Sequence, residues 1–375
     1  MTMPETNEEI AEVFGRDLDP LEKYESKFIH ELGVDPFAKF LEESIYPDDE
    51  ISESVEEDYE RDIRRWKEMM EDMGRHPACP KESHVIELIR RERDERGNSA
   101  NYIQHRVRRI NRAFSYFQND PKWPHDTDFQ PFETAKEKAD FGEKAKKEHH
   151  HIPLNELSDR IQGIKHIQDR AIVIMQLKLM LRAKELRNIR LEEINIQHAD
   201  IQEAYPELGT HNRVADRPNS LYIPPNPNSK SPTQGRQGNK SKNPKILPLD
   251  DEARQVLIDY LLIRPDVDQP TLFLSDEYNE MRLERVNQPW HEAFRPKYGE
   301  TQQHKPVSSH FGRHFTTDYL KQEAELAREK VQYLRGDVIG GDRFSGDKAA
   351  IDTYLHGHYS KVKEPYLETI FKLGI

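Results

Sequence analysis

The stretch over 126–151 limits the fold more than any other part of the chain, because it separates two regions with their own apolar patterns. It contains Pro131, a charged run over Lys136–Lys147 and three adjacent histidines at 149–151. Prolines and charges without apolar periodicity are typical of linkers. Adjacent histidines cannot all face one metal ion from a regular element, so they too favour a linker or hinge. The sequence therefore predicts two folded domains joined by a linker over 126–151.

Length and composition agree with this division. The chain has 375 residues, of which 35% are hydrophobic and 33% charged, enough for more than one core. No apolar run approaches the roughly 20 residues that a membrane-spanning helix needs, and the N-terminus lacks the basic and apolar leader of a secretory signal. Cys79 is the one cysteine, which excludes an intrachain disulfide. We expect a cytoplasmic protein without a membrane partner.

The acidity of the chain is concentrated at one end. The net charge is −13, but residues 1–60 hold twenty acidic against four basic residues, so the remainder carries about +3. Blocks of like charge are usually solvated or interaction tails. We therefore predict an acidic N-terminal arm over 1–46, and the charge does not exclude nucleic acid as a partner of the remainder.

The region over 47–125 has the periodicity of a small helical domain. Apolar residues recur at helical spacing along a helix that begins near Ser54, along a second over about 82–96 and along a third after Ser99. The last two helices carry a cluster of arginines: Arg90, Arg91, Arg93, Arg96, Arg106, Arg108, Arg109 and Arg112. Arginines on helices often form a solvated face, but a cluster across consecutive helices equally suits a DNA-backbone surface.

The region over 152–375 predicts a second, larger domain that is mainly helical with a small β-hairpin or sheet. Its expected elements are a helix near Glu156–Gly163, a buried helix over Ala171–Leu181 that continues through Arg182–Leu186, a strand over 189–196, a flexible loop or hairpin tip over 226–245, a short strand at Ile246–Leu249, a helix around Ala253–Tyr260 and a final helical region from Ser309.

Side chains of this domain match the needs of metal-free attack on a DNA phosphodiester. The transition state gathers negative charge, which planar guanidiniums can hold bidentately. Arg182 follows an apolar helix, where a charge is costly unless it is paired or used, and Glu185 could orient it. His310 and Arg313 share one helix face through their i, i+3 spacing. A histidine so placed could orient the attacking group or accept its proton.

The reaction also needs a nucleophile and an acid, and the sequence offers two candidates for each. Tyr354 and Tyr359 lie in the last element, where a tyrosine could form a phosphotyrosine ester. Lys240 and Lys242 lie in the loop, from which a lysine could protonate the 5′-leaving oxygen. Each residue alone is more often a core or surface residue. The order arginine, lysine, His-x-x-Arg, tyrosine is what favours an active site.

At these residues the chain resembles the tyrosine recombinases, the family of the Xer, Cre and lambda-integrase proteins. Leu181–Leu186 resembles the family's G-L-R-x-x-E-L box, with Leu179–Met180 in place of the usual Thr-Gly. Asn239–Leu249 resembles the hairpin that ends in K-x-x-K-x-R-x-x-P-L, without its arginine. His310–His314 matches H-x-L-R-H, and Ile351–His356 resembles I-Y-x-H.

The resemblance implies a role for each candidate. By spacing to Pro248, Lys240 falls on the catalytic lysine, and Lys242 is the alternative. Tyr354 falls on the nucleophile, with Tyr359 as the alternative. Arg182, Arg313 and His310 would contact the phosphate, and neither a cofactor nor a metal is implied.

One motif departs from the family. Leu334–Asp337 stands where the family usually has L-L-G-H or a tryptophan, so Asp337 replaces the second histidine. Either its hydrogen-bonding role changes or a neighbour assumes it. This L-R-G-D motif and the terminal Y-L-x-x-I-x-x-L-G-I are similar to integrases of halophilic archaea and their viruses, which would also suit the acidic composition.

The implied architecture is a helical core-binding (SAM-like) domain over 47–125 and a tyrosine-recombinase catalytic domain over 152–375. Together they would clamp double-stranded DNA at an attachment or recombination site, as a homo-tetramer. The implied function is site-specific recombination, as an integrase, through a 3′-phosphotyrosine. The alternatives are a recombinase-like DNA-binding protein without catalysis and a topoisomerase-like enzyme.

Overall fold

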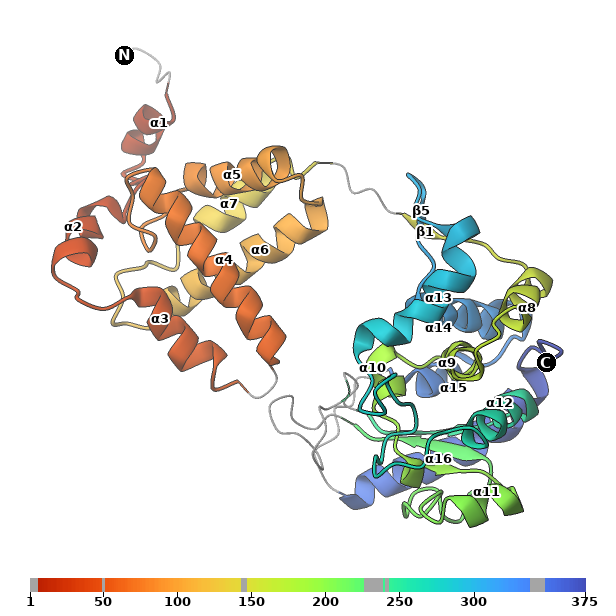
Figure 1. Cartoon of the computed structure of the whole chain (residues 1–375). Coiled ribbons are helices and arrows are strands. Elements are labelled where there is room, and N and C mark those ends of the chain that lie inside the picture. Colours follow the sequence, from red (N-terminus) through yellow and green to blue (C-terminus); the bar gives the residue numbers. More distant parts are fainter. Residues whose placement is uncertain (1–5, 49–50, 143–146, 226–238, 240–242, 338–347) are drawn as a thin grey trace. The chain divides into compact units, whose positions relative to one another are not determined.

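The computed structural model describes residues 6–48, 51–142, 147–225, 239, 243–337 and 348–375, with only the backbone described at 7, 8 and 348–357. The chain divides into two compact units, Met1–Ala145 and Lys146–Ile375 (Figure 1). Each unit has its own hydrophobic core. The described residues are mostly helical with two small sheets, which confirms the predicted fold class. None of the described helices is long and apolar enough to cross a membrane.

The first unit is helical. Its elements are α1 (Asn7–Val13), α2 (Glu22–His30), α3 (Pro36–Phe40) continued by a π-helical turn (Leu41–Ile45), α4 (Glu53–Asp72), α5 (Glu82–Arg90) continued by a second π turn (Arg91–Glu95), α6 (Ala100–Asn119) and α7 (Pro131–Lys138). Trp66 of α4 is fully buried in its core, and the indole N–H donates to the Pro77 carbonyl at 3.0 Å. The long periodic helices α4 and α6 lie where the sequence predicts them.

Two segments outside the helical domain predicted over 47–125, the arm and the linker, also pack into this unit. The first of them carries apolar residues at helical spacing over 21–46. Leu21, Phe28 and Phe40, from the stretch expected as an acidic arm, share one hydrophobic cluster with Trp66, while most of the described acids of that stretch stay exposed. Phe132 of α7, from the expected linker, is buried in the same cluster. Proline at the first helical position costs no hydrogen bond, so Pro131 begins α7 rather than excluding a helix.

In the second unit, helices surround a small sheet. Its helices are α8 (Leu154–Gln162), α9 (Ile167–Lys178), α10 (Ala183–Arg187), α11 (Ala199–Ala204), α12 (Asp251–Leu261), α13 (Leu283–Tyr298), α14 (Ser309–Asp318) with a π turn (Tyr319–Glu323), α15 (Arg328–Arg335) and α16 (Lys348–Thr369), with a 3₁₀ turn at Leu191–Glu193. Strands β2 (Ile194–Asn195), β3 (Ser220–Ile223) and β4 (Lys245–Pro248) form an antiparallel sheet in the order β2-β3-β4. Strands β1 (Glu148–His149) and β5 (His304–Lys305) pair in parallel.

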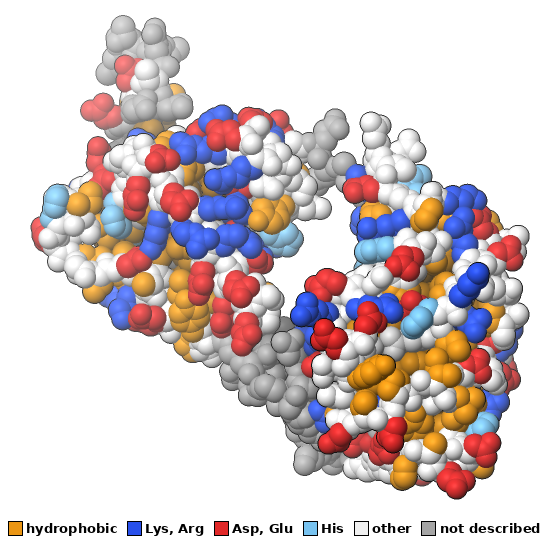
Figure 2. All heavy atoms as spheres, viewed as in Figure 1, with side chains coloured by type: hydrophobic (Ala, Val, Ile, Leu, Met, Phe, Trp, Pro, Cys, Tyr) orange, Lys and Arg blue, Asp and Glu red, His pale blue; other side chains and the backbone are white. Residues whose placement is uncertain are grey.

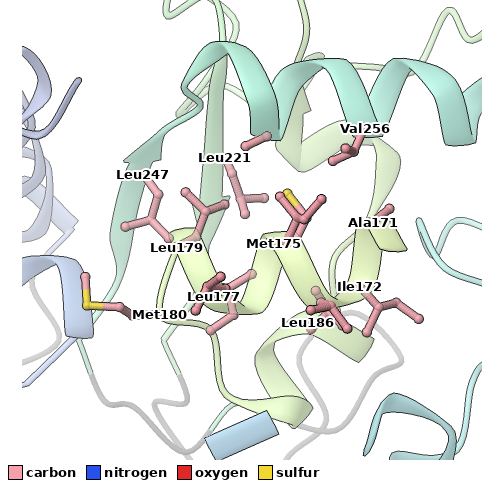
Figure 3. Close-up of a cluster of buried hydrophobic side chains, with 14 of the residues drawn as sticks. Ala171, Ile172, Met175, Leu177, Leu179, Met180, Leu186, Leu221, Leu247 and Val256 are labelled. Atoms are coloured by element: carbon pink, nitrogen blue, oxygen red, sulfur yellow. The ribbon is translucent and has the colours of Figure 1, made fainter. Parts of the chain in front are cut away.

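Helix α9 is the centre of this unit. It packs against both α12 and α14, and residues 171–178 are all buried. Figure 3 shows Ala171, Ile172, Met175 and Leu177 in the hydrophobic cluster of this unit. At its end, the buried Lys178 ammonium lies 2.5 Å from carboxylate oxygens of both Asp250 and Glu252. A buried cation needs such counter-charges, and they fix the start of α12 to the end of α9.

The helix expected to run from Ala171 through Leu186 is interrupted. α9 ends at Lys178, Met180 has a left-handed backbone with φ of 52°, and α10 begins after Arg182. Side chains of α14 satisfy the carbonyls at this break: the Thr316 hydroxyl donates to the end of α9 at 2.6 Å, and a guanidinium donates to the Met180 carbonyl at 2.7 Å. The prediction of one continuous helix is wrong because these tertiary bonds replace the helical ones.

Candidate active site

Helix α14 carries His310 and Arg313 one turn apart, as their spacing predicts. It approaches its neighbours closely because residue 312 is glycine. A Cβ at Gly312 would lie 2.8 Å from the Trp290 ring of α13 and 3.2 Å from the Leu177 Cα of α9. This close packing places Arg313 in the interior of the unit, where its side chain is 2% exposed.

The Arg313 guanidinium is fixed by two backbone carbonyls. Nη1 donates to Met180 at 2.7 Å and Nη2 donates to Arg335 at 2.8 Å. Burial, reinforced by the nearby Arg182, lowers the pKa of Arg313 to about 10, so it stays charged at neutral pH. Two fixed bonds hold the planar group in one orientation, which is what bidentate recognition of an anion needs.

Arg182 is positioned by the break between α9 and α10. It is the N-cap of α10, where its N–H donates to the Glu185 carboxylate at 3.0 Å. Its Nη1 donates to the other Glu185 oxygen at 2.8 Å, so Glu185 orients Arg182 as the spacing suggested. The Arg182 side chain stays one-quarter exposed. Arg182 is therefore accessible from solvent, whereas Arg313 lies in the interior.

The sequence did not single out Lys245, which lies against this pair. Its fully buried ammonium, at the start of β4, donates to Glu185 at 3.1 Å and to the Leu334 carbonyl at 3.3 Å. Burial lowers the pKa of Lys245 to about 8, opposed by the Glu185 charge. Burial alone would raise the pKa of Glu185, but Lys245 and Arg182 lower it. The sequence did hold one signal for this residue. Lys245 directly precedes the predicted apolar strand Ile246–Leu249, where a charge needs a partner.

Three imidazoles gather beside Arg313. The ring centroids of His310 and His314 are 4.5 Å apart, and His149 of β1 lies 4.1 Å from His314. Partial burial, then the charge of Arg313, lowers the pKa of His310, and burial lowers the pKa of His314 to about 4. His310 is thus neutral at pH 7 and able to accept a proton. Among the described residues, no group of His, Cys, Asp and Glu is arranged to hold a metal ion.

The Asp337 carboxylate contacts the guanidiniums of this site. One oxygen lies 3.1 Å from Nη2 of Arg313 and 3.7 Å from Nη2 of Arg182, and the other lies 2.7 Å from Nε of Arg335. The residue that replaces the expected histidine thus contacts the cations directly. The structure brings Arg182, Arg313 and their two carboxylates together from elements more than a hundred residues apart.

Some of the remaining candidate residues lie outside the part of the chain that the structure describes. Lys240 and Lys242 are outside the described residues. Tyr354 belongs to α16, but its side chain is not described. Tyr359 is 7% exposed, and burial raises its pKa to about 12, which does not favour an attacking phenolate. Tyr366 packs in the core and its hydroxyl donates to the Lys178 carbonyl at 2.9 Å.

In the first unit, most of the arginines considered for a DNA-backbone surface have carboxylate partners. Arg106 is buried between Asp62 and Glu92 and belongs to the core. The others with acidic partners are Arg90, Arg91, Arg93, Arg96, Arg109 and Arg112. Figure 2 shows basic and acidic side chains intermixed on the visible face of this unit. Arg108 of α6 is exposed.

Solved structures of DNA-bound integrases share this architecture. The Tn1549 transposon integrase in complex with transposon right end DNA matches with a TM-score of 0.56 and 16% identity, over 85% of this chain and 97% of that one. The chain has the fold of the tyrosine-recombinase integrases. The lambda integrase dimer bound to a COC' core site matches with a TM-score of 0.53 and 12% identity, over 79% and 93% of the two chains.

The integrase fold is thus shared at low sequence identity. A further complex of the Tn1549 integrase, with a circular intermediate DNA, matches with a TM-score of 0.57 and 15% identity, over 85% of this chain and 93% of that one. No protein-family model matches the sequence, and no curated protein sequence does. The similarity therefore concerns the fold, and the chemistry of the site depends on the residues of this chain.

Proposed function

We propose that the chain is a site-specific DNA recombinase that cuts and rejoins DNA through a 3′-phosphotyrosine without a metal ion. One observation carries the proposal: the guanidiniums of Arg182 and Arg313, from separate elements, face a single anion, the Asp337 carboxylate. Two charged, planar donors around one anion are what a pentavalent phosphate transition state needs.

Each candidate then has one role. Tyr354 attacks the scissile phosphate, and Arg182 and Arg313 hold the phosphorane oxygens. Neutral His310 accepts the tyrosine proton or orients the hydroxyl. Lys240, or Lys242 in its place, protonates the 5′-leaving oxygen. Loss of one arginine contact would lower the cleavage rate roughly 100-fold or more.

The partner in this proposal is double-stranded DNA carrying an attachment or recombination site. The fold similarity to DNA-bound integrases supports that partner. We further propose assembly as a homo-tetramer on two sites, action in the cytoplasm, and an origin in a mobile element or virus of halophilic archaea. The acidic composition and the L-R-G-D motif favour that origin.

A covalent adduct tests the proposal. The full chain is incubated with nicked, end-labelled duplexes that cover the DNA flanking its own gene, and products are separated under denaturing conditions. We expect a protein–DNA adduct that Tyr354→Phe abolishes and Tyr359→Phe retains. An adduct that survives Tyr354→Phe but not Tyr359→Phe would assign the nucleophile to Tyr359.

Two other functions have distinct outcomes in the same experiment. The alternative motivated by Asp337 in place of a histidine, a recombinase-like DNA-binding protein without catalysis, would bind a specific duplex and form no adduct. A topoisomerase-like enzyme would form the adduct and relax supercoiled plasmid, but would not exchange strands between two sites.

A further inference from the structure

Asp337 lies where the cationic groups of the candidate active site converge. Its two oxygens contact three guanidiniums, those of Arg182, Arg313 and Arg335, at distances of 3.7, 3.1 and 2.7 Å. Carboxylate and phosphate present similar pairs of anionic oxygens to a guanidinium. The carboxylate therefore fills the position in which the proposed reaction would hold a phosphate.

The backbone of Asp337 is fixed, but its side chain can leave. Gly336 ends α15 with a left-handed φ of 68°, and the Asp337 N–H donates to the Gln332 carbonyl at 2.9 Å. The side chain is 33% exposed. A rotation about its own bonds can therefore move the carboxylate into solvent without any change in the helix.

We propose that Asp337 is an internal anion that closes the arginine cluster until a phosphate displaces it. The identity of the natural ligand, a DNA phosphate, rests on the proposed function, whereas the competition between two anions rests on the contacts alone. A carboxylate and a phosphate cannot both occupy the cluster at contact distance, because like charges repel strongly there. Each binding event must therefore overcome the ion pairs of Asp337.

This competition would make the site selective. Free phosphate has only the guanidiniums to bind, so the carboxylate, which is always present at high effective concentration, outcompetes it. A phosphate within a duplex is also held by contacts along the rest of the DNA, which offset the loss of the Asp337 ion pairs. Asp337 thus restricts the cluster to phosphates that the protein already holds in place.

Titration with inorganic phosphate tests the inference without a DNA site. Calorimetry at low ionic strength compares the full unmutated chain, Asp337→Asn and the control Asp276→Asn, which removes an acid whose side chain is 87% exposed. We expect Asp337→Asn to bind phosphate about tenfold or more tightly than the other two. Adding Arg313→Lys should abolish that gain, since lysine cannot form the bidentate contact.

Equal or weaker phosphate binding by Asp337→Asn would overturn the proposal, because a residue that merely holds the arginines in place would weaken the site when changed. Thermal unfolding checks that each variant is folded, and Asp337→Ser takes the place of Asp337→Asn if that variant does not fold. The DNA adduct is measured separately. A chain that fails to form the adduct can still show the phosphate gain, so the two proposals fail independently.

Discussion

At the scale of single residues, the candidate site depends on the buried carboxylate of Glu185. Glu185 is fully buried and bonds to both Arg182 and Lys245. Glu185→Gln would leave the buried Lys245 ammonium without a counter-charge. We expect this variant to lose about 3–5 kcal/mol of unfolding free energy, measured by urea unfolding of the full chain.

The partner of Glu185 supplies the control. In the double variant Glu185→Gln, Lys245→Met both charges are gone, and replacing a buried ion pair in this way is often nearly neutral. The double variant should therefore recover at least half of the lost stability. Glu300→Gln, which removes the exposed partner of Lys147, should leave unfolding unchanged. A single Glu185→Gln variant as stable as the parent would contradict the charge argument.

His310 gives the site a predicted pH dependence. Its pKa lies below the ordinary 6.5, through partial burial and the positive charge of Arg313, so the ring is neutral and can accept a proton at pH 7. Protonation removes this capacity. The rate of adduct formation should be level between pH 7 and about 6.5 and fall at lower pH. Single-turnover rates of the parent and of His310→Gln measure it.

Two variants, His310→Gln and His314→Gln, distinguish the titration of His310 from that of its neighbour. His310→Gln should be slower and should lack the acid decline, whereas His314→Gln should retain it, because the pKa of His314 is about 4. An unchanged decline in His310→Gln would assign the titration to another group.

How much of the site could be predicted differs from residue to residue. Arg182, His310 and Arg313 could be grouped because their residue types and spacing meet the needs of attack on a phosphodiester, and because their order along the chain resembles one family. The contacts of Lys245 could not, since they depend on where β4 begins relative to α10. Likewise, His149 reaches His314 only because β1 pairs in parallel with β5, a long-range contact that no local pattern signals.

At the scale of elements, Gly312 determines how deeply α14 packs. Glycine to alanine in a helix usually stabilises by roughly 0.5–1 kcal/mol. Here the added Cβ would lie 2.8 Å from Trp290, and overpacking typically costs about 1–3 kcal/mol. We therefore expect Gly312→Ala to lower the thermal stability and, by moving Arg313, the cleavage rate.

A second change tests whether the contact with Trp290 is responsible. Trp290→Phe removes the ring atoms nearest to Gly312, so the double variant should regain cleavage relative to Gly312→Ala alone. If Trp290→Phe merely adds its own loss, the clash lies instead with the backbone of α9, where Leu177 Cα is 3.2 Å away.

The elements also show which sequence signals were sufficient. Long helices with one apolar face, such as α4 and α6, were predictable because their pattern persists over many turns. The interruption after α9 was not, because the carbonyl freed at the left-handed Met180 is satisfied from α14, a long-range contact that no local pattern signals. Helix α7 was missed because proline suggested a linker, although proline is favoured at the first helical position.

At the scale of the whole molecule, the two units have separate cores, and buried histidines predict the same sensitivity to acid in both. Burial keeps histidines neutral in both: the pKa values of His84 and His125 in the first unit and of His310 and His314 in the second are lowered. Such groups take up protons more readily in the unfolded chain, so each unit should lose stability as the pH falls below 6.5.

His125 offers the sharpest test of this sensitivity. Its ring is buried among Phe28, Phe114 and Phe117, its Nε2 lies 2.7 Å from the Ala78 carbonyl oxygen, and burial lowers its pKa to about 4. Below pH 6.5 the unfolded state gains the proton while the folded state gains none until about pH 4. Stability is therefore complete above pH 6.5 and decreases by up to about 3 kcal/mol as the pH falls to about 4.

Unfolding of the first unit measures that decrease at a series of pH values. It is followed by fluorescence in a Trp290→Phe background, in which Trp66 and Trp123 of the first unit are the remaining tryptophans. His125→Gln keeps a side-chain donor for the Ala78 carbonyl but cannot titrate, so its stability should depend less steeply on pH. The control His30→Gln changes an exposed histidine and should follow the parent. An identical slope in His125→Gln and the parent would mean that other buried groups, such as His84, account for the acid sensitivity of this unit.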